Sequence, residues 1–335
     1  MRTRAKLIVG ALGFVAATTG LVLWQSTPPR LESVGTKLPI TSVCGWLSPQ
    51  EVVCEGGIFD LRTRQFRPLP FPLRSLNISH NFPDSMARDP ITVYDNLTPS
   101  PDGKWLLYRE TVNHKEREYD QNFVVVHPDG SGLRRITNSH HEWQSSSPFW
   151  LADSSGWINY YYTYGTLASG SSLYSREKNY PESRRAKGPC PTSIQNDGRF
   201  LYVNERNEEF VLCANDDMRT CTTVSVGQVL PSSGAITRFT VSRDSKWILA
   251  SRDIQASQIP ERATWEVLLK RKLPVTYDEF WLLSTDGKTK RCLARETITE
   301  ETHKYSQGFS ASFSPDGKQA LVFQPGKSGS YLVSL

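Results

Sequence analysis

A polar turn followed by a short apolar stretch recurs along the chain. Residues 100–104 and 314–318 both read Ser-Pro-Asp-Gly-Lys, and apolar runs follow at Leu106–Tyr108 and Ala320–Phe323. Aspartate caps backbone N–H groups and glycine accepts positive φ, so each Asp-Gly pair predicts a tight turn. The Leu, Trp and Tyr residues that follow predict a half-buried strand. Weaker copies are centred on Gln50, Asp153 (one residue longer), Asp197 and Asp244.

The spacing of these turns predicts the fold. Taken at Gln50, Asp102, Asp153, Asp197, Asp244 and Asp316, they are 52, 51, 44, 47 and 72 residues apart. A second hairpin completes the unit, as in Phe123–His127 and Leu133–Thr137 around Pro128–Gly132. Four short strands at a period of about 45–50 residues are typical of a β-propeller blade. We therefore expect an all-β chain, a six-bladed β-propeller with four-stranded blades over residues 44–335. Its structural turns are expected at Asp102, Gly103, Asp153, Asp197, Gly198, Asp244, Asp316 and Gly317.

The repeat resembles that of a known group of propellers. Arg135–Thr137, Pro148–Trp150, the Asp153 turn and Ile158–Tyr160 follow one another in that order. This is similar to the TolB-like, WD-repeat-like six-bladed propellers, whose repeat runs (L/I)-T, then P-x-W-S-P-D-G-x-x-(I/L)-x-(F/Y). The resemblance spans Cys44 to Leu335 and implies six blades. It implies little about activity, because propellers host many unrelated functions.

The two ends of the expected propeller complement each other. The last unit ends at Ser330–Leu335, which corresponds to the third strand of a blade, so its fourth strand is missing. Residues 26–43 form a linker before the first unit, and Leu31–Leu38 within it has no other assignment. We expect Leu31–Leu38 to be the outer strand of the last blade, because this pairing closes the ring and removes an exposed edge.

The N-terminus reads as a targeting segment. Residues 7–24 carry no charge, and Arg2, Arg4 and Lys6 precede them. A basic flank before an apolar stretch of this length is typical of a signal peptide or a signal anchor, here residues 1–25. Thr18 and Gly20 are small enough for a cleavage site, so both alternatives stay open. We expect a body anchored in the membrane by this helix and facing the periplasm or extracellular space, or exported if the leader is cleaved.

Six cysteines suit such a compartment, because disulfides persist outside the cytoplasm. Cys44 and Cys54 flank one predicted turn, and Cys213 and Cys221 flank another. Each pair is equidistant from its turn, as opposed residues of a hairpin are. We expect these two disulfides, with buried thiols as the alternative. Cys190 and Cys292 stay unassigned.

Charge argues against one class of partner. Four of the 39 basic residues, Arg2, Arg4, Lys6 and Arg30, precede the first acidic residue, Glu32; 35 basic residues then stand against 34 acidic ones. A dedicated nucleic-acid binder usually carries a basic face, so we expect no nucleic-acid partner. We expect the body to be monomeric.

Recognisable catalytic motifs are missing. The chain has neither a G-x-S-x-G elbow nor a P-loop, and His140-His141-Glu142 lacks the spacing of a zinc site. The sequence therefore predicts no catalytic, cofactor-binding or metal-binding residues, and no cofactor.

The long connections define the expected binding surface. In a four-stranded blade the Asp-Gly turns lie on one face, which we call the turn face. Opposite it lies the long-loop face, where we expect four long pieces, residues 70–92, 109–122, 163–172 and 252–278. Long loops on a rigid scaffold often carry function, although tolerated insertions are the alternative.

These features predict a non-catalytic, exported or membrane-tethered propeller that binds a protein or peptide on its long-loop face. The alternative is a propeller enzyme, a lyase, cyclase or hydrolase with its site in the central funnel. The absence of a convergent His, Glu and Asp set weighs against the enzyme.

Overall fold

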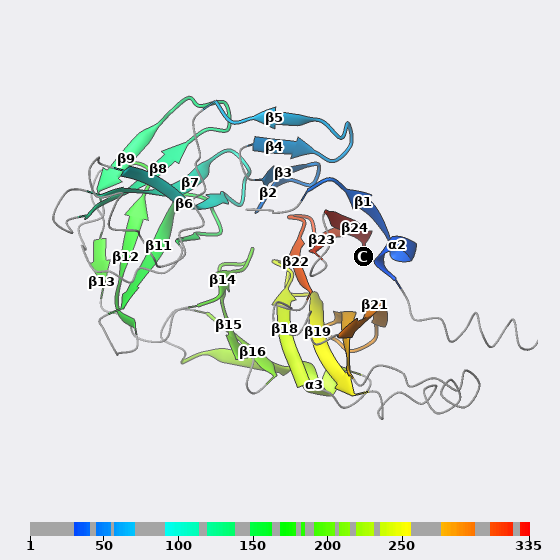
Figure 1. The fold of residues 1–335 in the computed structure, drawn as a ribbon. Helices are drawn as coiled ribbons and strands as arrows, with labels where there is room; N and C mark the ends of the chain where they lie inside the picture. Colours follow the sequence, from blue (N-terminus) through cyan, green and yellow to red (C-terminus); the bar gives the residue numbers. More distant parts are fainter. Residues whose placement is uncertain are drawn as a thin grey trace, which may run out of the picture.

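The computed structural model describes residues 30–40, 45–54, 57–70, 91–113, 119–137, 148–162, 168–178, 182–184, 191–204, 208–214, 219–230, 235–255, 276–298, 309–323 and 329–335. Their strands form six four-stranded antiparallel sheets arranged in a ring (Figure 1). The six-bladed, all-β architecture expected from the repeat is thus confirmed.

Each sheet is one blade, and in five of the six the strands follow one another in chain order from the inside of the ring outward; in blade six the outermost strand is β1. Blade one contains β2 (Gly45–Ser48), β3 (Glu51–Cys54), β4 (Gly57–Asp60) and β5 (Phe66–Pro68). Blade two contains β6 (Ile91–Pro99), β7 (Leu106–Asn113), β8 (Tyr119–Val126) and β9 (Arg134–Thr137). Blade three contains β10 (Phe149–Trp150), β11 (Gly156–Tyr162), β12 (Ala168–Ser175) and β13 (Glu182–Arg184).

The second half of the chain repeats this arrangement. Blade four contains β14 (Ser193–Ile194), β15 (Phe200–Asn204), β16 (Glu209–Cys213) and β17 (Cys221–Ser225), followed by the short helix α3 (Val226–Val229). Blade five contains β18 (Ala235–Val241), β19 (Trp247–Gln255), β20 (Thr276–Ser284) and β21 (Lys290–Ile298). Blade six contains β22 (Ser310–Phe313), β23 (Gln319–Phe323), β24 (Ser330–Ser334) and β1 (Gly35–Leu38).

Strand β1 closes the ring. It pairs antiparallel with β24, from Gly35 opposite Val333 to Leu38 opposite Ser330. The closing strand is shorter than expected, because Leu31–Val34 form the short helix α2 instead. The Leu31 side chain is fully buried and packs in the cluster that joins blades five and six.

The core is divided among the seams between blades. Side chains of a strand alternate between its two faces, so each blade packs against both neighbours. An apolar cluster fills each seam; the one between blades two and three contains Leu107, Phe123, Trp157 and Tyr174. Indole N–H groups add polar links between inner strands, since Trp46 donates to the Ser312 carbonyl and Trp150 to that of Thr98.

The Asp-Gly turns hold themselves together by hydrogen bonds. In the turn of blade two, Ser100 Oγ donates to Asp102 Oδ1 at 2.6 Å, and the same carboxylate accepts the Lys104 N–H at 3.1 Å. These bonds to the ionised form outweigh the effect of burial and hold the pKa of Asp102 below its usual value. Gly103, Gly198 and Gly317 have φ of 69°, 83° and 66°.

The turn at Asp153 is not longer than the others. Leu151 N donates to Gly156 O, just as Ser100 N donates to Trp105 O, so Gly156 takes the place of Trp105. Ser154, with φ of 60°, takes the place of the turn glycine. Trp157 therefore starts the apolar strand, as Leu106 does in blade two, and packs toward the preceding blade.

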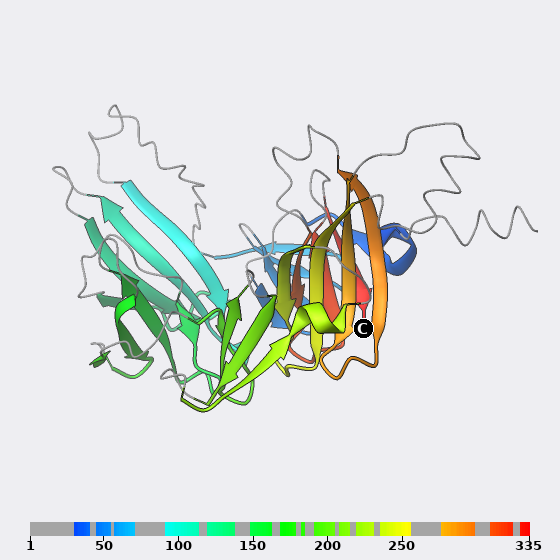
Figure 2. The same ribbon diagram turned by 90° about the horizontal axis from the view of Figure 1, so that it is seen from below.

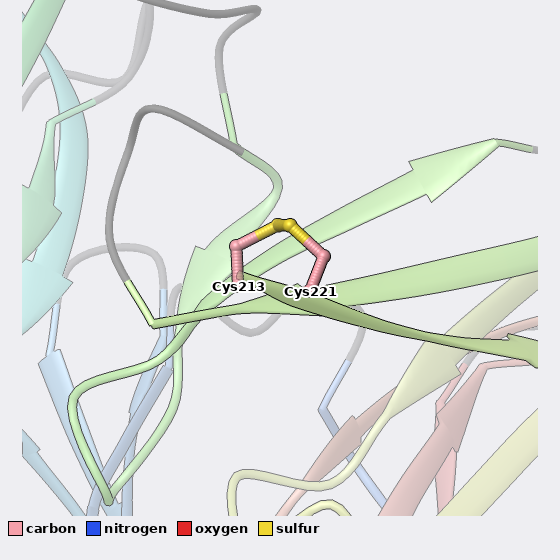
Figure 3. The surroundings of a disulfide bond; sticks show 2 residues. All are labelled: Cys213 and Cys221. Carbon is pink, nitrogen blue, oxygen red and sulfur yellow. A yellow bond between two sulfur atoms is a disulfide. The ribbon is translucent and has the colours of Figure 1, made fainter. Parts of the chain in front are cut away.

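Figure 3 shows the Cys213–Cys221 disulfide, which confirms that expected pair. The two residues face each other across β16 and β17, with Cα atoms 4.1 Å apart. Cys44 and Cys190 lie outside the described residues, so the Cys44–Cys54 pairing stays a prediction. Cys292 is not in a disulfide.

Replacing Cys213 and Cys221 together with serine should lower the free energy of unfolding by roughly 2–3 kcal/mol at most, because a short loop constrains the unfolded chain only modestly. Urea denaturation measures the difference, with Cys292→Ser as the control thiol. An unchanged midpoint would show that this hairpin is fully ordered without its covalent link.

No helix within the described ranges is long and apolar enough to cross a membrane. The expected signal peptide or anchor, residues 1–25, lies outside those ranges.

Candidate functional site

The blades differ in height. In blade five β19, β20 and β21 each have nine residues, and in blade two β7 and β8 have eight. The strands β3 and β4 of blade one have four, and β23 and β24 of blade six have five. At about 3.3 Å per residue, four extra residues carry blade five roughly 13 Å farther. Figure 2 shows the long strands of blades two, three and five rising on the same face.

The tall strands extend on the long-loop face, and two of the tall blades are opposite each other. Contacts between the inner strands of blades one and two, three and four, five and six, and six and one run around the ring. Hydrogen bonds from Asp102 N to Ser154 Oγ and from Asn196 N to Arg243 O join blades two to three and four to five. Blades two and five are therefore three places apart in a ring of six.

Several residues expected in loops belong to these strands instead. Arg109–Asn113 lies in β7 and Tyr119–Asn122 in β8, whereas 109–122 was expected to be one loop. Likewise Arg252–Gln255 lies in β19 and Thr276–Asp278 in β20. The loops are shorter than expected because the hairpins continue pairing past their apolar residues.

A buried ion network crosses the tall part of blade five on the face toward blade four. Arg252, Glu279 and Arg295 lie side by side on β19, β20 and β21. Arg252 Nη2 and Arg295 Nη2 lie 2.6 Å and 2.7 Å from the two Glu279 carboxylate oxygens. Trp281 Nε1 also donates to Glu279, at 2.9 Å. Arg252 and Glu279 are each only 1% exposed, whereas the Arg295 side chain is 21% exposed, so the buried carboxylate serves one buried and one partly exposed guanidinium group.

The network keeps Glu279 ionised. Burial alone raises the pKa of a carboxyl, but the hydrogen bonds from Arg252 and Trp281 and the charges of both arginines favour the ionised form. Together they hold the pKa of Glu279 below its usual value. Glu279 is therefore a fixed negative charge that positions its neighbours and is poorly suited to proton transfer near neutral pH.

The opposite face of blade five, toward blade six, carries a titrating acid. Asp278 is 5% exposed and accepts a hydrogen bond from Ser251 Oγ at 2.6 Å. Burial, followed by the nearby charges of Asp253 and Glu296, raises the pKa of Asp278 to about 7, against the opposing effect of Ser251 and of the Phe309 N–H. A carboxyl with this pKa exchanges its proton near neutrality, which is the property of a general acid or base.

Blade two has a smaller network at the same height. Glu110 is buried, and its carboxylate accepts from Arg135 Nε at 3.1 Å and from Asn122 Nδ2 at 3.4 Å. Glu110 lies eight residues after Asp102, and Arg252 lies eight residues after Asp244, so they occupy the same position of the repeat. The two opposite tall blades are thus each crossed by a charged network.

The tyrosine-rich strand of blade three packs inside the molecule. Trp157 and Tyr160 are almost fully buried in seams, which agrees with a packing role rather than a binding platform. Asn159 Oδ1 and Trp157 Nε1 are buried and have no hydrogen-bond partner among the residues that the structure describes.

The turn residues that were predicted from the sequence lie at one end of the blades. The charged networks lie at the other end. The structure places Asp102, Gly103, Asp153, Asp197, Gly198, Asp244, Asp316 and Gly317 in the turns of the turn face. It brings Ser251, Arg252, Asp278, Glu279 and Arg295 together on blade five, and sequence reasoning missed all five. One signal was present: a pair of charged residues adjoins the apolar run of each strand, with Arg252-Asp253 shortly after Ile248–Ala250 and Asp278-Glu279 directly before Phe280–Leu283.

Among the described residues, no group of three or more His, Cys, Asp or Glu side chains could hold a metal ion. His140, His141 and Glu142 lie outside the described residues.

No protein-family model matches the chain, and no curated protein sequence matches it. Membership of the TolB-like family therefore stays a prediction. Similar solved structures include oligogalacturonate lyase from Vibrio parahaemolyticus, at 12% identity over 85% of this chain and 73% of that one, with a TM-score of 0.45. An uncharacterised protein from Listeria monocytogenes is 13% identical over 90% and 79%, with a TM-score of 0.46. Puromycin hydrolase is 10% identical over 82% and 38%, with a TM-score of 0.41. These likenesses are too distant to bear on what the chain does.

Proposed function

We propose that this propeller binds a protein or peptide partner on its long-loop face, with the tall blades two and five on either side of the partner. The observation that carries the proposal is the pair of charged networks in those blades. A partner surface needs elements that project from the ring and yet keep their shape. Blades two and five project farther than blades one and six, and charged hydrogen bonds fix their strands to one another.

The networks favour a positioning role over a purely stabilising one. Taking charges out of water costs several kcal/mol per ion, and apolar residues of similar volume often pack as well. The buried Arg252–Glu279 pair in blade five therefore favours a role in holding one fixed arrangement of its strands. Among the described residues the turn face offers no comparable projection, because most of its hairpins end in tight Asp-Gly or Asp-Ser turns.

The proposed location of the body is outside the cytoplasm, tethered to a membrane or exported. It rests on the apolar leader after Arg2, Arg4 and Lys6 and on the Cys213–Cys221 disulfide, a bond that is rare in cytosolic proteins.

The test removes one surface at a time from the full chain. Gln255 and Thr276 pair with each other at the end of the β19–β20 ladder, so residues 256–275 can be replaced by a short Gly/Ser linker without cutting a described strand. After cross-linking in the native envelope, we expect one protein to be captured at a saturable ratio by the parent chain, and at least about tenfold less by the linker variant.

The matched control changes the turn face of the same blade. Lys246 and Lys288 have 76% and 84% exposed side chains there, and reversing both charges should leave capture unchanged. Equal capture by the linker variant, or loss of capture in the control, would place the partner elsewhere.

Asp278 favours a second candidate function, an enzyme. A carboxyl that titrates near pH 7 beside a serine hydroxyl suits acid–base chemistry in a lyase, cyclase or hydrolase. Its position on β20, the third strand of its blade, differs from the central funnel expected from the sequence. Turnover in a screen of glycans and peptides that Asp278→Asn abolishes would favour this candidate over partner binding.

A further inference from the structure

Asp278 lies where blade five meets blade six, at the end of the seam that opens onto the long-loop face. Its carboxylate accepts from Ser251 Oγ within blade five and from the Phe309 N–H, which precedes β22 of blade six. Asp278 is therefore bonded on both sides of one seam. The seam below it is apolar and contains Leu249, Phe280 and Phe309.

The charged groups around Asp278 are mostly acidic. Asp253 lies directly opposite it on β19, and Glu296 on the neighbouring strand β21 also acts on its charge. Two described basic residues lie on this face of blade five: Arg238, which pairs with Ser251 from the innermost strand, and Arg291, which pairs with Leu282 farther along β21 toward the turn face. From the blade-six side, Tyr331 donates its hydroxyl to Glu32 of α2, and the charge of Glu296 reaches this tyrosine as well.

We propose that Asp278 is a pH-sensitive switch for the ring. With its proton bound, it closes the long-loop end of the seam between blades five and six, and loss of the proton loosens that end. The inference goes beyond partner binding and holds whether or not a partner docks there.

The physical reason is the cost of a buried charge. An ionised Asp278 would sit almost out of water beside two other carboxylates, whereas the neutral acid keeps its hydrogen bonds and avoids the repulsion. If the seam opens, water reaches the carboxyl and relieves both penalties. The pKa of Asp278, about 7 in the closed ring, accordingly differs from the ordinary value of 3.8 that it regains when solvated.

The sign of the effect follows from that difference. The closed state binds the proton more tightly than the open state, so protonation stabilises the seam fully below about pH 4. This contribution is lost as the pH rises to about 7, and above that value the stability of the closed seam no longer changes with pH. The opening equilibrium constant should rise about tenfold per pH unit across this window. Carboxylates with a lowered pKa, such as Asp286, act in the opposite direction and at lower pH.

Hydrogen exchange of the full chain between pH 5 and 8 tests the switch. We compare peptides from 276–284 and 309–313 in the parent chain and in Asp278→Asn at each pH, so that the intrinsic exchange rate cancels. Asparagine imitates the neutral acid, so at pH 8 the variant should exchange at least about tenfold more slowly in these peptides. Peptides from blade one should not differ.

Two further variants separate the switch from a general structural role. Glu296→Gln removes one repelling charge, so the pH range over which exchange increases should end at a lower pH. Below that range the seam should stay closed. Asp286→Asn, on the turn face of the same blade, should leave the window unchanged. Equal exchange by Asp278→Asn and the parent at pH 8, or an unmoved window in Glu296→Gln, overturns the proposal.

A direct titration covers the case in which Asp278→Asn does not fold. Carbon NMR of the parent chain labelled at aspartate carboxyls should show one resonance that titrates near pH 7 and is missing in the Asp278→Glu variant. Titration of every aspartate below pH 5 would refute the switch.

Discussion

Replacing Glu279 with alanine should lower the free energy of unfolding by about 3–5 kcal/mol, because it leaves two guanidinium groups without their shared carboxylate. Arg252 is 1% exposed and cannot turn toward water without opening the seam between blades four and five. Trp281 Nε1 loses its acceptor in the same change. Urea denaturation followed by tryptophan fluorescence measures the loss.

Two controls show whether the unpaired charges cause this loss. The double variant Arg252→Met, Glu279→Leu removes the central pair and keeps the volume apolar, so it should be far closer to the parent than Glu279→Ala. Glu51→Ala breaks the exposed pair with Arg67 and should cost at most about 1 kcal/mol. If Glu279→Ala costs no more than Glu51→Ala, the buried network does not hold blade five.

Deleting residues 31–38 should lower the free energy of unfolding at least as much as Glu279→Ala does, on the order of 5 kcal/mol. The deletion removes β1 and exposes the edge of β24, which then becomes a template for pairing with other chains. It also removes two nearly fully buried leucines, Leu31 and Leu38, each worth about 1.5–3 kcal/mol. We expect a lower melting temperature together with aggregation, measured by calorimetry and light scattering.

The matched control keeps the strand and changes only its exposed positions. Thr36 and Lys37 are exposed on β1, so Thr36→Ser with Lys37→Arg should leave melting and solubility unchanged. A synthetic peptide of residues 30–40 should restore part of the lost melting temperature, because the missing strand can be supplied from outside. A deletion variant that melts and dissolves like the parent would refute ring closure by β1.

Local sequence predicted the blades because the turn chemistry is local. Within the turn, Asp102 Oδ1 bonds to Ser100 and Lys104, each two residues away, and the strand after it alternates over a few positions, so both signals survive in the unfolded chain. The turn at Asp153 was wrongly read as longer, because Trp157 was matched to Trp105 by residue type. The backbone hydrogen bond from Leu151 N to Gly156 O and the pairing of Trp157 with Trp150 reveal that Gly156 fills the tryptophan position.

The candidate site could not be predicted in the same way. Arg252 and Glu279 are 27 residues apart in the chain, and the charged ends of their strands resemble a solvated loop in sequence. Asp278 has an ordinary neighbourhood along the chain, and its pKa is raised by burial in a seam whose other side is blade six. Burial and cross-strand pairing are properties of the assembled ring.

The sequence by itself determined the repeat, the number of blades, the closing role of the segment before blade one and the Cys213–Cys221 hairpin. Each depends on spacing or on short-range chemistry that is present before the chain folds. The tertiary structure alone decided which blades stand tall, which charges are buried and which acid titrates near neutrality. Those outcomes depend on how far each hairpin continues past its apolar residues and on what the neighbouring blade places against it. Residues far apart in the chain must come together before such properties exist.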